Sequence, residues 1–239
     1  MARQIAAQGQ HVVLVARTPE RLGEVAERIR RSTAVDVRIV SADLARRDGI
    51  ATLLESTADL TVETLVAAAG YGTAGGFLDI DSEAELTMVD LNSRAVVEIT
   101  RAYAEAMVER GTGTIVLFSS IVAFQGVARS TTYAATKAFV QVFGEGLRME
   151  LAPSGVDVII TAPGPVDTGF AARADMSIGG AADPEAVARA TLRRVGRATT
   201  VRPGARSLLL GTALRLLPRS LASRVMSSVM SGFVSHRTA

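Results

Sequence analysis

The chain has 239 residues, of which 48% are hydrophobic and 21% charged, and its formal net charge is +2. This length and apolar content are enough to bury a sizeable core, which argues against intrinsic disorder. The absence of cysteine excludes disulfide bonds, thiolate metal ligands and a cysteine nucleophile. With His11 and His236 as the two histidines, we expect neither a metal site nor a Ser-His-Asp hydrolase.

The charges are unevenly distributed along the chain. Residues 186–239 contain ten arginines and no acidic residue, a charge of +10, while residues 1–185 carry −8. Such a basic segment can bind nucleic acid, anionic lipid or an acidic partner. Phe233 is its single aromatic residue, so bases would have no platform on which to stack, and we expect no nucleic-acid binding.

Neither end of the chain reads as a membrane or export signal. The first residues, MARQIAAQGQ, lack the apolar core of a signal peptide. The longest apolar run, Leu208 to Leu217, is interrupted by Gly211, Thr212 and Arg215 and is too short to span a bilayer. The sequence therefore predicts a cytoplasmic protein.

Short apolar runs alternate with longer stretches of helical periodicity. The predicted strands are His11–Val15, Val35–Val40, Thr64–Ala69, Thr114–Phe118 and Val156–Thr161. The predicted helices are Thr18–Arg31, Arg46–Ser56, Ser82–Glu109, Thr131–Leu151 and one from Asp183 to about Val195. Continuous apolar strands are typical of parallel sheets buried on both faces. The alternation predicts an α/β fold with a doubly wound parallel sheet of the Rossmann type and three layers, α/β/α.

The domain prediction is a single Rossmann-type domain over residues 1–204. Residues 205–239 are predicted as a basic, amphipathic helical extension of the same domain, broken at Pro218. The chain opens on what resembles the back half of a helix, followed by a turn at Gly9 and a strand. In a nucleotide-binding fold, an opening strand and a glycine-rich phosphate loop would precede that helix.

Two residues of the segment YAATK carry the first chemical signal. Tyr133 and Lys137 are four residues apart, so on a helix their side chains project from one face. A lysine ammonium ~4–5 Å from the phenol would lower the tyrosine pKa of ~10 by about 2 to 3 units, which suits a proton donor and acceptor at neutral pH. Lys137 is also the single lysine of the chain.

Further candidate residues lie at the ends of two predicted strands and inside one predicted helix. Ser120 ends the strand TIVLFSS, where ligands of parallel sheets bind and where its hydroxyl can orient a substrate oxygen. Asn92 lies inside a predicted helix, so it either distorts that helix or holds a water molecule. Pro163 and Gly164 set a rigid turn after the strand that ends at Thr161.

Ser120, Tyr133, Lys137 and then Pro163-Gly164-x-Val166-x-Thr168 resemble, at these spacings, the short-chain dehydrogenase/reductase family. The resemblance runs from residue 2 to about 170. It implies an oxidoreductase that passes hydride between a nicotinamide and a substrate carbon.

The resemblance also implies roles for residues of the catalytic group. Tyr133 would be the general acid/base, Lys137 would lower its pKa and bind the nicotinamide ribose, and Ser120 would polarise the substrate carbonyl. Asn92 would hold the water that links Lys137 to solvent. The cofactor would be contacted by these and further residues: Asp43, Leu44, Ala69, Gly70, Pro163, Gly164, Val166 and Thr168, with Asp43 at the adenine and Val166 and Thr168 at the carboxamide.

The end of the strand HVVLVAR indicates which cofactor is used. An acidic residue there would bind the ribose diol of NAD, but Ala16 and Arg17 occupy these positions. A neutral residue followed by a guanidinium suits a 2′-phosphate, so the sequence favours NADP(H) over NAD.

Two departures from the family pattern leave alternatives open. Ala67-Ala68-Ala69-Gly70 replaces the family's Asn-Asn-Ala-Gly, and no Thr-Gly-x-x-x-Gly-x-Gly segment is present. The strand before that segment would lie between the strands His11–Val15 and Thr64–Ala69. One hypothesis is an active NADP(H)-dependent reductase of which this sequence is a shortened record. The alternative is a catalytically inactive chain that binds partners or lipids.

The expected substrate is a lipophilic carbonyl or alcohol compound, such as a 3-oxoacyl thioester, a sterol or a polyketide-like ketone. This follows from the small and apolar segment Gly169–Ala182, a lid in the family, and from Phe124, Val127, Phe170 and Met176 nearby. The resemblance implies a homodimer or homotetramer. The 205–239 segment is predicted to cover the pocket or a subunit interface, with peripheral contact to anionic lipid as the other interpretation.

Overall fold

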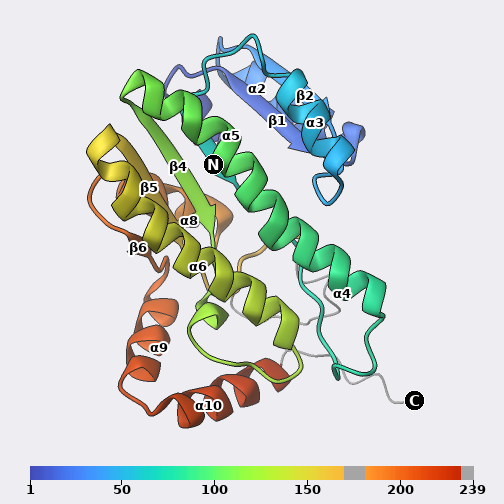
Figure 1. Ribbon diagram of the computed structural model, residues 1–239, viewed down its shortest axis with the longest axis vertical. Helices are drawn as coiled ribbons and strands as arrows, with labels where there is room; N and C mark the ends of the chain where they lie inside the picture. The colour runs from blue at the N-terminus through green and yellow to red at the C-terminus, as the bar shows by residue number, and fades with distance from the viewer. Residues whose placement is uncertain (170–180, 233–239) are drawn as a thin grey trace. The chain divides into compact units, whose positions relative to one another are not determined.

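The computed structural model describes residues 1–169 and 181–232, apart from the side chains of Arg206 and Arg215, and has two compact units, Met1–Thr61 and Val62–Ala239. The first unit is blue in Figure 1, and the second runs from cyan to red. Compact units of this size occur within single domains, so the predicted domain boundary at residue 204 stays a prediction.

The first unit is a two-stranded parallel sheet with three helices. Its elements in chain order are α1 (Ala2–Ala6), β1 (Val12–Ala16), α2 (Pro19–Ser32), β2 (Val37–Ser41) and α3 (Arg47–Glu55). Pro19 opens α2 at its first turn, and Leu22, Ala26 and Ile29 form the buried stripe of that helix. The predicted helix, turn at Gly9 and strand at the start of the chain are confirmed, and Gly9 has a positive φ of 85°.

The second unit is built on a four-stranded parallel sheet. Its strands are β3 (Thr64–Ala67), β4 (Gly113–Phe118), β5 (Val156–Thr161) and β6 (Thr200–Val201), in the order β3-β4-β5-β6. Ile115 and Leu117 of β4 and Val158 and Ile160 of β5 are completely buried, as continuous apolar strands predict. The short strand β6 was not predicted, because two residues are too few for a periodic signal.

The two long helices of this unit lie side by side on the sheet (Figure 1). The first of these helices is continuous through α4 (Ser82–Val89), a π-helical segment (Asp90–Arg94) and α5 (Ala95–Arg110). The second is α6 (Thr131–Leu151), whose predicted bounds are confirmed. The prediction of one regular helix over Ser82–Glu109 is wrong at its centre, since the chain widens into a π-helix around Asn92.

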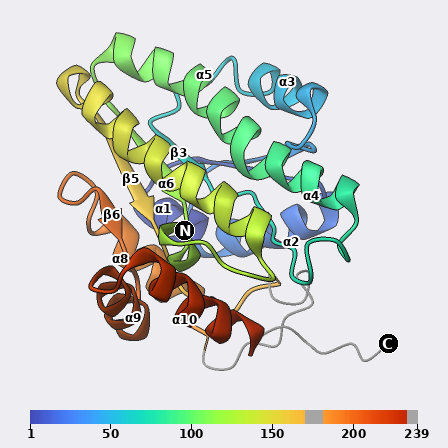
Figure 2. The ribbon, with the colours of Figure 1, turned by 60° about the horizontal axis from the view of Figure 1, so that its bottom comes forward.

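The remaining helices complete the second unit. Asp183 caps α8 (Pro184–Leu192) by accepting hydrogen bonds from the backbone N–H groups of Glu185 and Ala186. Helices α9 (Ala205–Arg215) and α10 (Arg219–Ser231) are separated at Pro218, as predicted. Figure 2 shows them near the N-terminal end of α6, and Leu214, Ala222 and Met226 pack into one core cluster with Ile121 and Ala134.

The sheet topology agrees with the expected parallel α/β fold. Within the described residues β1 pairs with β2 alone, and β3 pairs with β4 alone. These are the two strands between which the sequence predicted that the family's opening strand would lie. Of the helices in residues 1–169 and 181–232, none is long and apolar enough to cross a bilayer.

Candidate active site

The candidate site of the second unit begins at the carboxyl ends of β4 and β5. The two strands run in parallel, so Ser119-Ser120 and Pro163-Gly164, which follow them, reach the same edge of the sheet. The backbone N–H of Ile121 donates to the carbonyl of Pro163 over 2.9 Å and holds the two ends together. Ser120 begins a short 3-10 helix (Ile121–Phe124), and its hydroxyl accepts a hydrogen bond from the N–H of Val122.

Helix α6 brings Tyr133 and Lys137 to this edge on one face, as the four-residue spacing predicted. The Lys137 Nζ lies 5.8 Å from the centre of the Tyr133 ring and donates to the carbonyl of Phe118 over 2.9 Å. The hydroxyl of Ser119 donates to the carbonyl of Lys137, and the side chains of Ser120 and Tyr133 are hydrogen-bonded. The structure therefore brings Ser120, Tyr133 and Lys137 into one cluster.

Burial sets the pKa of both titratable groups. It raises the pKa of Tyr133 to about 12, against a smaller lowering by the hydrogen bond with Ser120, and it lowers the pKa of Lys137 to about 8. The expectation that Lys137 lowers the pKa of Tyr133 towards neutrality is wrong for this structure. The ammonium faces the ring and the Phe118 carbonyl, and loss of solvent outweighs its attraction for a phenolate.

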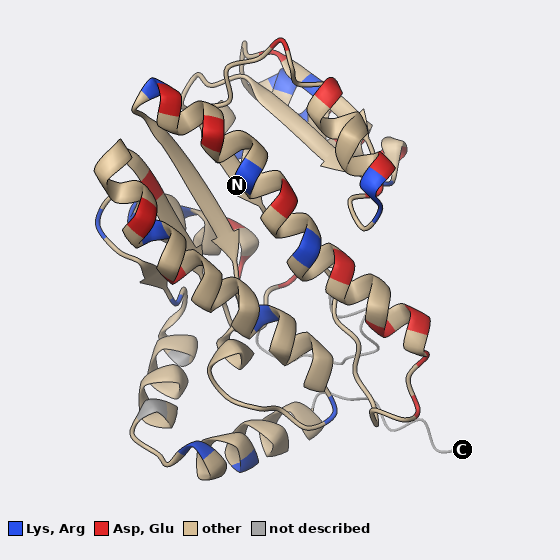
Figure 3. Ribbon diagram, in the orientation of Figure 1, with Lys and Arg blue, Asp and Glu red and all other residues tan. Residues whose placement is uncertain are grey.

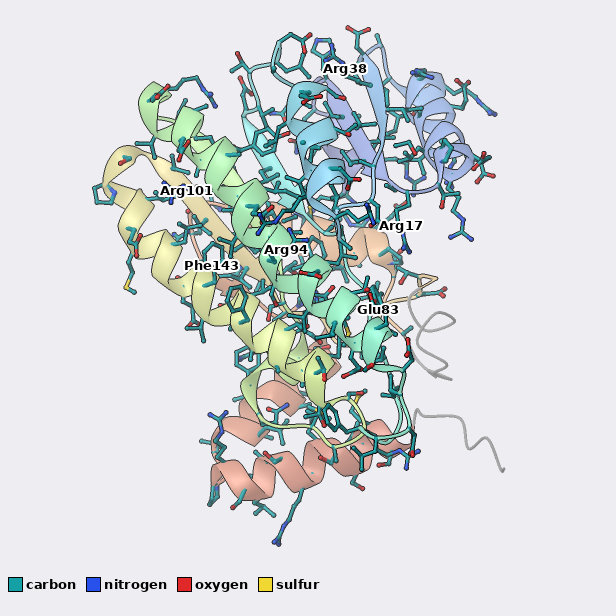
Figure 4. The ribbon with its side chains drawn as sticks, turned by 45° about the vertical axis from the view of Figure 1, so that its right-hand side comes forward. Arg17, Arg38, Glu83, Arg94, Arg101 and Phe143 are labelled. Atoms are coloured by element: carbon teal, nitrogen blue, oxygen red, sulfur yellow. The ribbon has the colours of Figure 1, made fainter. Side chains whose placement is uncertain are left out.

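Asn92 is fully buried in the π-helical segment and ties it to the chain after β3. Its Oδ1 accepts from the N–H of Tyr71 over 3.2 Å, while its Nδ2 donates to the Tyr71 carbonyl over 2.8 Å and to Thr136 Oγ1 over 3.1 Å. Both donors of the amide are thus in use, and one lone pair of Oδ1 remains for a water molecule. Arg94 spans the same segment by ion pairs with Asp90 and Glu98, and is labelled in Figure 4.

Gly70 is required where Asn92 and Lys137 approach the chain. A Cβ at this position would lie 2.8 Å from Asn92 Oδ1 and 3.5 Å from Lys137 Nζ. A side chain would therefore displace the amide that holds the segment, and it would fill the space beside the ammonium. Gly70 therefore belongs to the cluster, while Ala69, which precedes it, is exposed.

The turn after β5 is held by α9. The N–H of Gly164 donates to Ser207 Oγ over 3.1 Å, and a Cβ on Gly164 would lie 2.4 Å from that oxygen. Val166 forms a parallel bridge with Ala182, whereas Thr168 is exposed. The predicted lid lies largely outside the described residues, including Phe170 and Met176.

The residues predicted at the adenosine end lie in the first unit. Arg17 follows β1, and its Nη1 is 4.0 Å from Asp43 Oδ2; the Arg17 side chain is 61% exposed and is labelled in Figure 4. Asp43 Oδ1 accepts from the N–H of Ala45, and Leu44 is buried. A Cβ on Gly49 would lie 2.1 Å from the Asp43 carbonyl, so close packing of α3 fixes this loop.

The sequence reasoning missed the residues that support the cluster. Thr136 and the backbone of Tyr71 hold Asn92, and Ser207 holds the Gly164 turn. Thr136 stands one residue before Lys137, a signal that was available. Ser207 lies 43 residues from Gly164 and has no local signature.

Comparison with known proteins identifies the family. The family model described as short chain dehydrogenase matches residues 1–177, and the chain belongs to this family of oxidoreductases. An uncharacterized oxidoreductase of Staphylococcus saprophyticus is 32% identical over 194 residues, which are 80% of this chain and 83% of that protein. A similar protein of Staphylococcus epidermidis is 29% identical over 170 residues, 70% of this chain and 72% of that protein.

Solved structures show the same Rossmann-type α/β fold. A 7beta-hydroxysteroid dehydrogenase has a TM-score of 0.87 at 23% identity, covering 94% of this chain and 90% of that one. A short-chain dehydrogenase from Sphingobium yanoikuyae in complex with NADPH has a TM-score of 0.82 at 28% identity over 100% and 92%. A bulky-bulky ketone specific alcohol dehydrogenase from Comamonas testosteroni has a TM-score of 0.77 at 26% identity over 100% and 90%.

Proposed function

We propose that this chain is an NADP(H)-dependent oxidoreductase that interconverts a carbonyl and an alcohol on a lipophilic substrate. The observation that carries the proposal is the cluster of Ser120, Tyr133 and Lys137 at the carboxyl edge of β4 and β5. Nothing in the packing of the fold requires a hydroxyl, a phenol and a buried ammonium at one place, and a proton-transfer site does.

Tyr133 acts on the substrate oxygen. In the reductive direction its Oη–H gives a proton to the oxygen of the carbonyl, and in the oxidative direction it takes the proton back from the alcohol. A pKa of about 12 keeps the phenol protonated at neutral pH, which is the form that gives the proton in reduction. Ser120 Oγ, hydrogen-bonded with Tyr133, donates to the same substrate oxygen and fixes its position.

Lys137 and Asn92 support the tyrosine. The ammonium is buried beside Gly70, where it would bind the ribose hydroxyls of the nucleotide. The free lone pair of Asn92 Oδ1 would hold the water that connects Lys137 to solvent. A bound nicotinamide would supply the hydride for reduction or accept it in oxidation.

The residues of each unit, taken separately, suit one end of an NADP(H) nucleotide. The exposed guanidinium of Arg17 forms an ion pair with Asp43 at 4.0 Å, too long for a hydrogen bond, so its N–H donors would turn to a 2′-phosphate. Asp43 and Leu44 would contact the adenine. Ala69, Gly70, Pro163 and Gly164 would line the nicotinamide half, with Val166 and Thr168 at the carboxamide. The NADPH complex of the Sphingobium relative supports this choice over NAD.

The substrate class is proposed from the lining of the site. Ile121 and Phe124, which follow Ser120 in the sequence, line a cavity of about 270 Å³ with the apolar side chains of Leu214, Leu217 and Ala222, and Gln125 and Arg219 add polar groups to this mostly apolar lining. Such a lining accepts an aliphatic or ring-bearing body better than a polar metabolite. The bulky-ketone activity of the Comamonas relative agrees with a 3-oxoacyl, sterol or polyketide-like ketone. We further propose a cytoplasmic homodimer or homotetramer.

The first test replaces the proton-transferring group. Tyr133→Phe removes the hydroxyl and keeps the ring, so we expect turnover of a bulky ketone to fall by about 10²- to 10⁴-fold while NADPH binding persists. Turnover is followed by NADPH absorbance. Binding is measured by thermal shift, where ligand at 100 times its dissociation constant stabilises by about 2.7 kcal/mol.

Tyr103→Phe is the matched control, because Tyr103 packs against the core cluster of β4 and β5. It is expected to keep its turnover. Equal turnover of Tyr133→Phe and the wild type would disprove the role of Tyr133. NADPH binding without turnover of any ketone by the wild type would favour the inactive, partner-binding alternative.

A second test concerns the choice of cofactor. Arg17→Ala should raise KM for NADPH by about 10- to 100-fold and leave KM for NADH unchanged, because a charge-assisted contact worth ~1.5–3 kcal/mol is lost. Arg31→Ala, an exposed arginine at the far end of α2, is the control. A parallel loss for both cofactors would show that Arg17 does not read the 2′-phosphate.

A further inference from the structure

Helix α9 is buried on one face and exposes leucines on the opposite face. Its inner face, with Ser207, Gly211 and Leu214 at spacings of four and three residues, is buried against the rest of the second unit. Its outer face exposes Leu208 by 53%, Leu209 by 71% and, just past the helix end, Leu216 by 83%. Neighbouring large apolar side chains that stay exposed mark a site of interaction, so the outer face needs a partner.

The exposed leucines continue around the bend at Pro218. Leu221 of α10 is 43% exposed, while Ala222, Met226 and Met230 form the buried stripe of that helix. We call Leu208, Leu209, Leu216 and Leu221 the leucine face. It belongs to two adjacent helices whose inner sides pack in the core cluster, while its own leucines are 43% to 83% exposed.

The charge around the leucine face has one sign. Arg219 and Arg224 are exposed on α10, and Figure 3 shows basic residues on α10 and no acidic residue on the described part of α9 and α10. In the sequence all 54 residues from Ala186 to Ala239 include ten arginines and no acid. Two copies meeting through this face would place like charges against each other, which disfavours self-association.

We propose that the leucine face docks this protein onto an anionic membrane surface. The leucines enter the boundary between headgroups and acyl chains, and the arginines pair with lipid phosphates and carboxylates. The combination of exposed leucines with a purely basic surround favours such a surface over an apolar protein partner, which would leave the arginines without counter-charges.

Docking would bring the proposed site close to lipid. The inner sides of the same two helices supply Leu214, Leu217 and Ala222 to the cavity lined by Ile121 and Phe124, which follow Ser120 in the sequence. A lipophilic ketone dissolved in the bilayer would then have a short path to the cavity. This consequence rests on the proposed function, whereas the docking itself does not and is measured without turnover.

The test is flotation of the full chain with vesicles, either of phosphatidylcholine alone or of phosphatidylcholine mixed with phosphatidylserine. We expect binding to the mixed vesicles, weaker binding to the neutral ones, and release by salt. The variant Leu209→Ser, Leu216→Ser should bind at least 10-fold more weakly, because two exposed apolar side chains lose their insertion.

The charge is tested by Arg219→Gln, Arg224→Gln, with an expected loss of about five-fold per arginine on anionic vesicles. Two matched controls should bind as the wild type does. One is Leu78→Ser, Leu86→Ser, which removes exposed leucines of 92% and 61%, and the other is Arg28→Gln, Arg31→Gln on α2. Thermal unfolding confirms that every variant is folded.

Three outcomes would overturn the proposal. They are no flotation of the wild type with anionic vesicles, equal losses in the leucine variant and its control, and binding that is indifferent to phosphatidylserine. Light scattering adds a fourth: if the leucine variant dissociates an oligomer and does not alter flotation, the face joins two copies instead. Activity of the Tyr133→Phe variant has no influence on this assay, so failure of the proposed function is recognised separately.

Discussion

Burial moves the pKa values of Tyr133 and Lys137 in opposite directions for one physical reason. Removing water disfavours the charged form of each group, so the pKa of the phenol rises to about 12 and that of the ammonium falls to about 8. The side chains of the pair are partly or fully buried, and the ammonium donates to the Phe118 carbonyl. The cluster therefore carries an energetic cost that a bound nucleotide and substrate would offset.

A residue-scale prediction follows for the stability of the chain. Because the folded pKa of Lys137, about 8, lies below its ordinary value of 10.5, the unfolded chain binds more protons between these pH values, and the free energy of unfolding rises with pH there. Lys137→Met removes this pH dependence together with the cost of burying the ammonium. At neutral pH we expect the variant to be more stable by about 2 kcal/mol, after loss of the hydrogen bond to Phe118.

The measurement is Tm of both proteins between pH 7 and 9.5, below the pH at which Tyr133 contributes. The advantage of Lys137→Met should shrink as the pH rises, since wild-type Lys137 becomes neutral in the folded chain. Lys137→Arg, which stays charged throughout, serves as the control. A difference in Tm that does not change with pH would contradict the lowered pKa.

At the scale of single elements, α6 is the helix on which the site depends, and Gly144 sets its distance from the sheet. A Cβ on Gly144 would lie 2.5 Å from Ile160 Cγ1 and 2.9 Å from Leu117 Cδ1, both in the core. The helix can thus lie close enough for Lys137 to reach the carbonyl at the end of β4. Between α4 and α5, the π-helical segment positions Asn92 so that its side chain can hydrogen-bond to Tyr71 and Thr136.

We predict that Gly144→Ala destabilises the fold although alanine is the better helix former. Overpacking against Ile160 lowers the free energy of unfolding by about 1–3 kcal/mol, and the higher helix propensity of alanine raises it by about 0.5–1 kcal/mol. Denaturant unfolding should show a net loss of about 1 to 2 kcal/mol. The control is Gly23→Ala in α2, where a Cβ meets no atom within 4 Å and where stability should rise. A gain for Gly144→Ala would disprove the close packing.

At the scale of the molecule, α6 presents an apolar stripe on its outer side. Phe139, Val142 and Met149 recur at helical spacing and are exposed by 42%, 68% and 74%. The ring of Phe139 stacks on Phe143, labelled in Figure 4, with centres 5.9 Å apart. We assign the proposed homo-oligomer contact to this stripe, which is separate from the leucine face of α9 and α10.

Val142→Glu should convert the oligomer into monomers. A carboxylate at the centre of an apolar interface would lose its hydration without a partner, so we expect association at least 100-fold weaker. Size-exclusion chromatography with light scattering measures the mass. Leu78→Glu, at a more exposed site outside α6, is the control and should leave the mass unchanged. An unchanged oligomer in Val142→Glu would exclude the stripe as the contact.

The sequence by itself determined the features that depend on neighbours along the chain. Apolar strands, helical spacing and caps predicted the parallel α/β order, the bounds of α6 and the break at Pro218, and the four-residue spacing placed Tyr133 and Lys137 on one face. The spacing of the family's motif added Ser120, whose position at a strand end brings it to the edge of the sheet where Tyr133 and Lys137 lie.

Only the tertiary structure decided what depends on residues distant in sequence. Loss of solvent raised the pKa of Tyr133, whereas the sequence predicted that it would be lowered. The hydrogen-bond partners of Asn92 are Tyr71 and Thr136, which are distant from it in sequence. Both the exposed and the buried positions of α9 hold leucine, so the sequence alone could not show which face of the helix is buried. The reason is that desolvation, hydrogen-bond partners and exposure are properties of the packed neighbourhood, whereas periodicity reports the local chain.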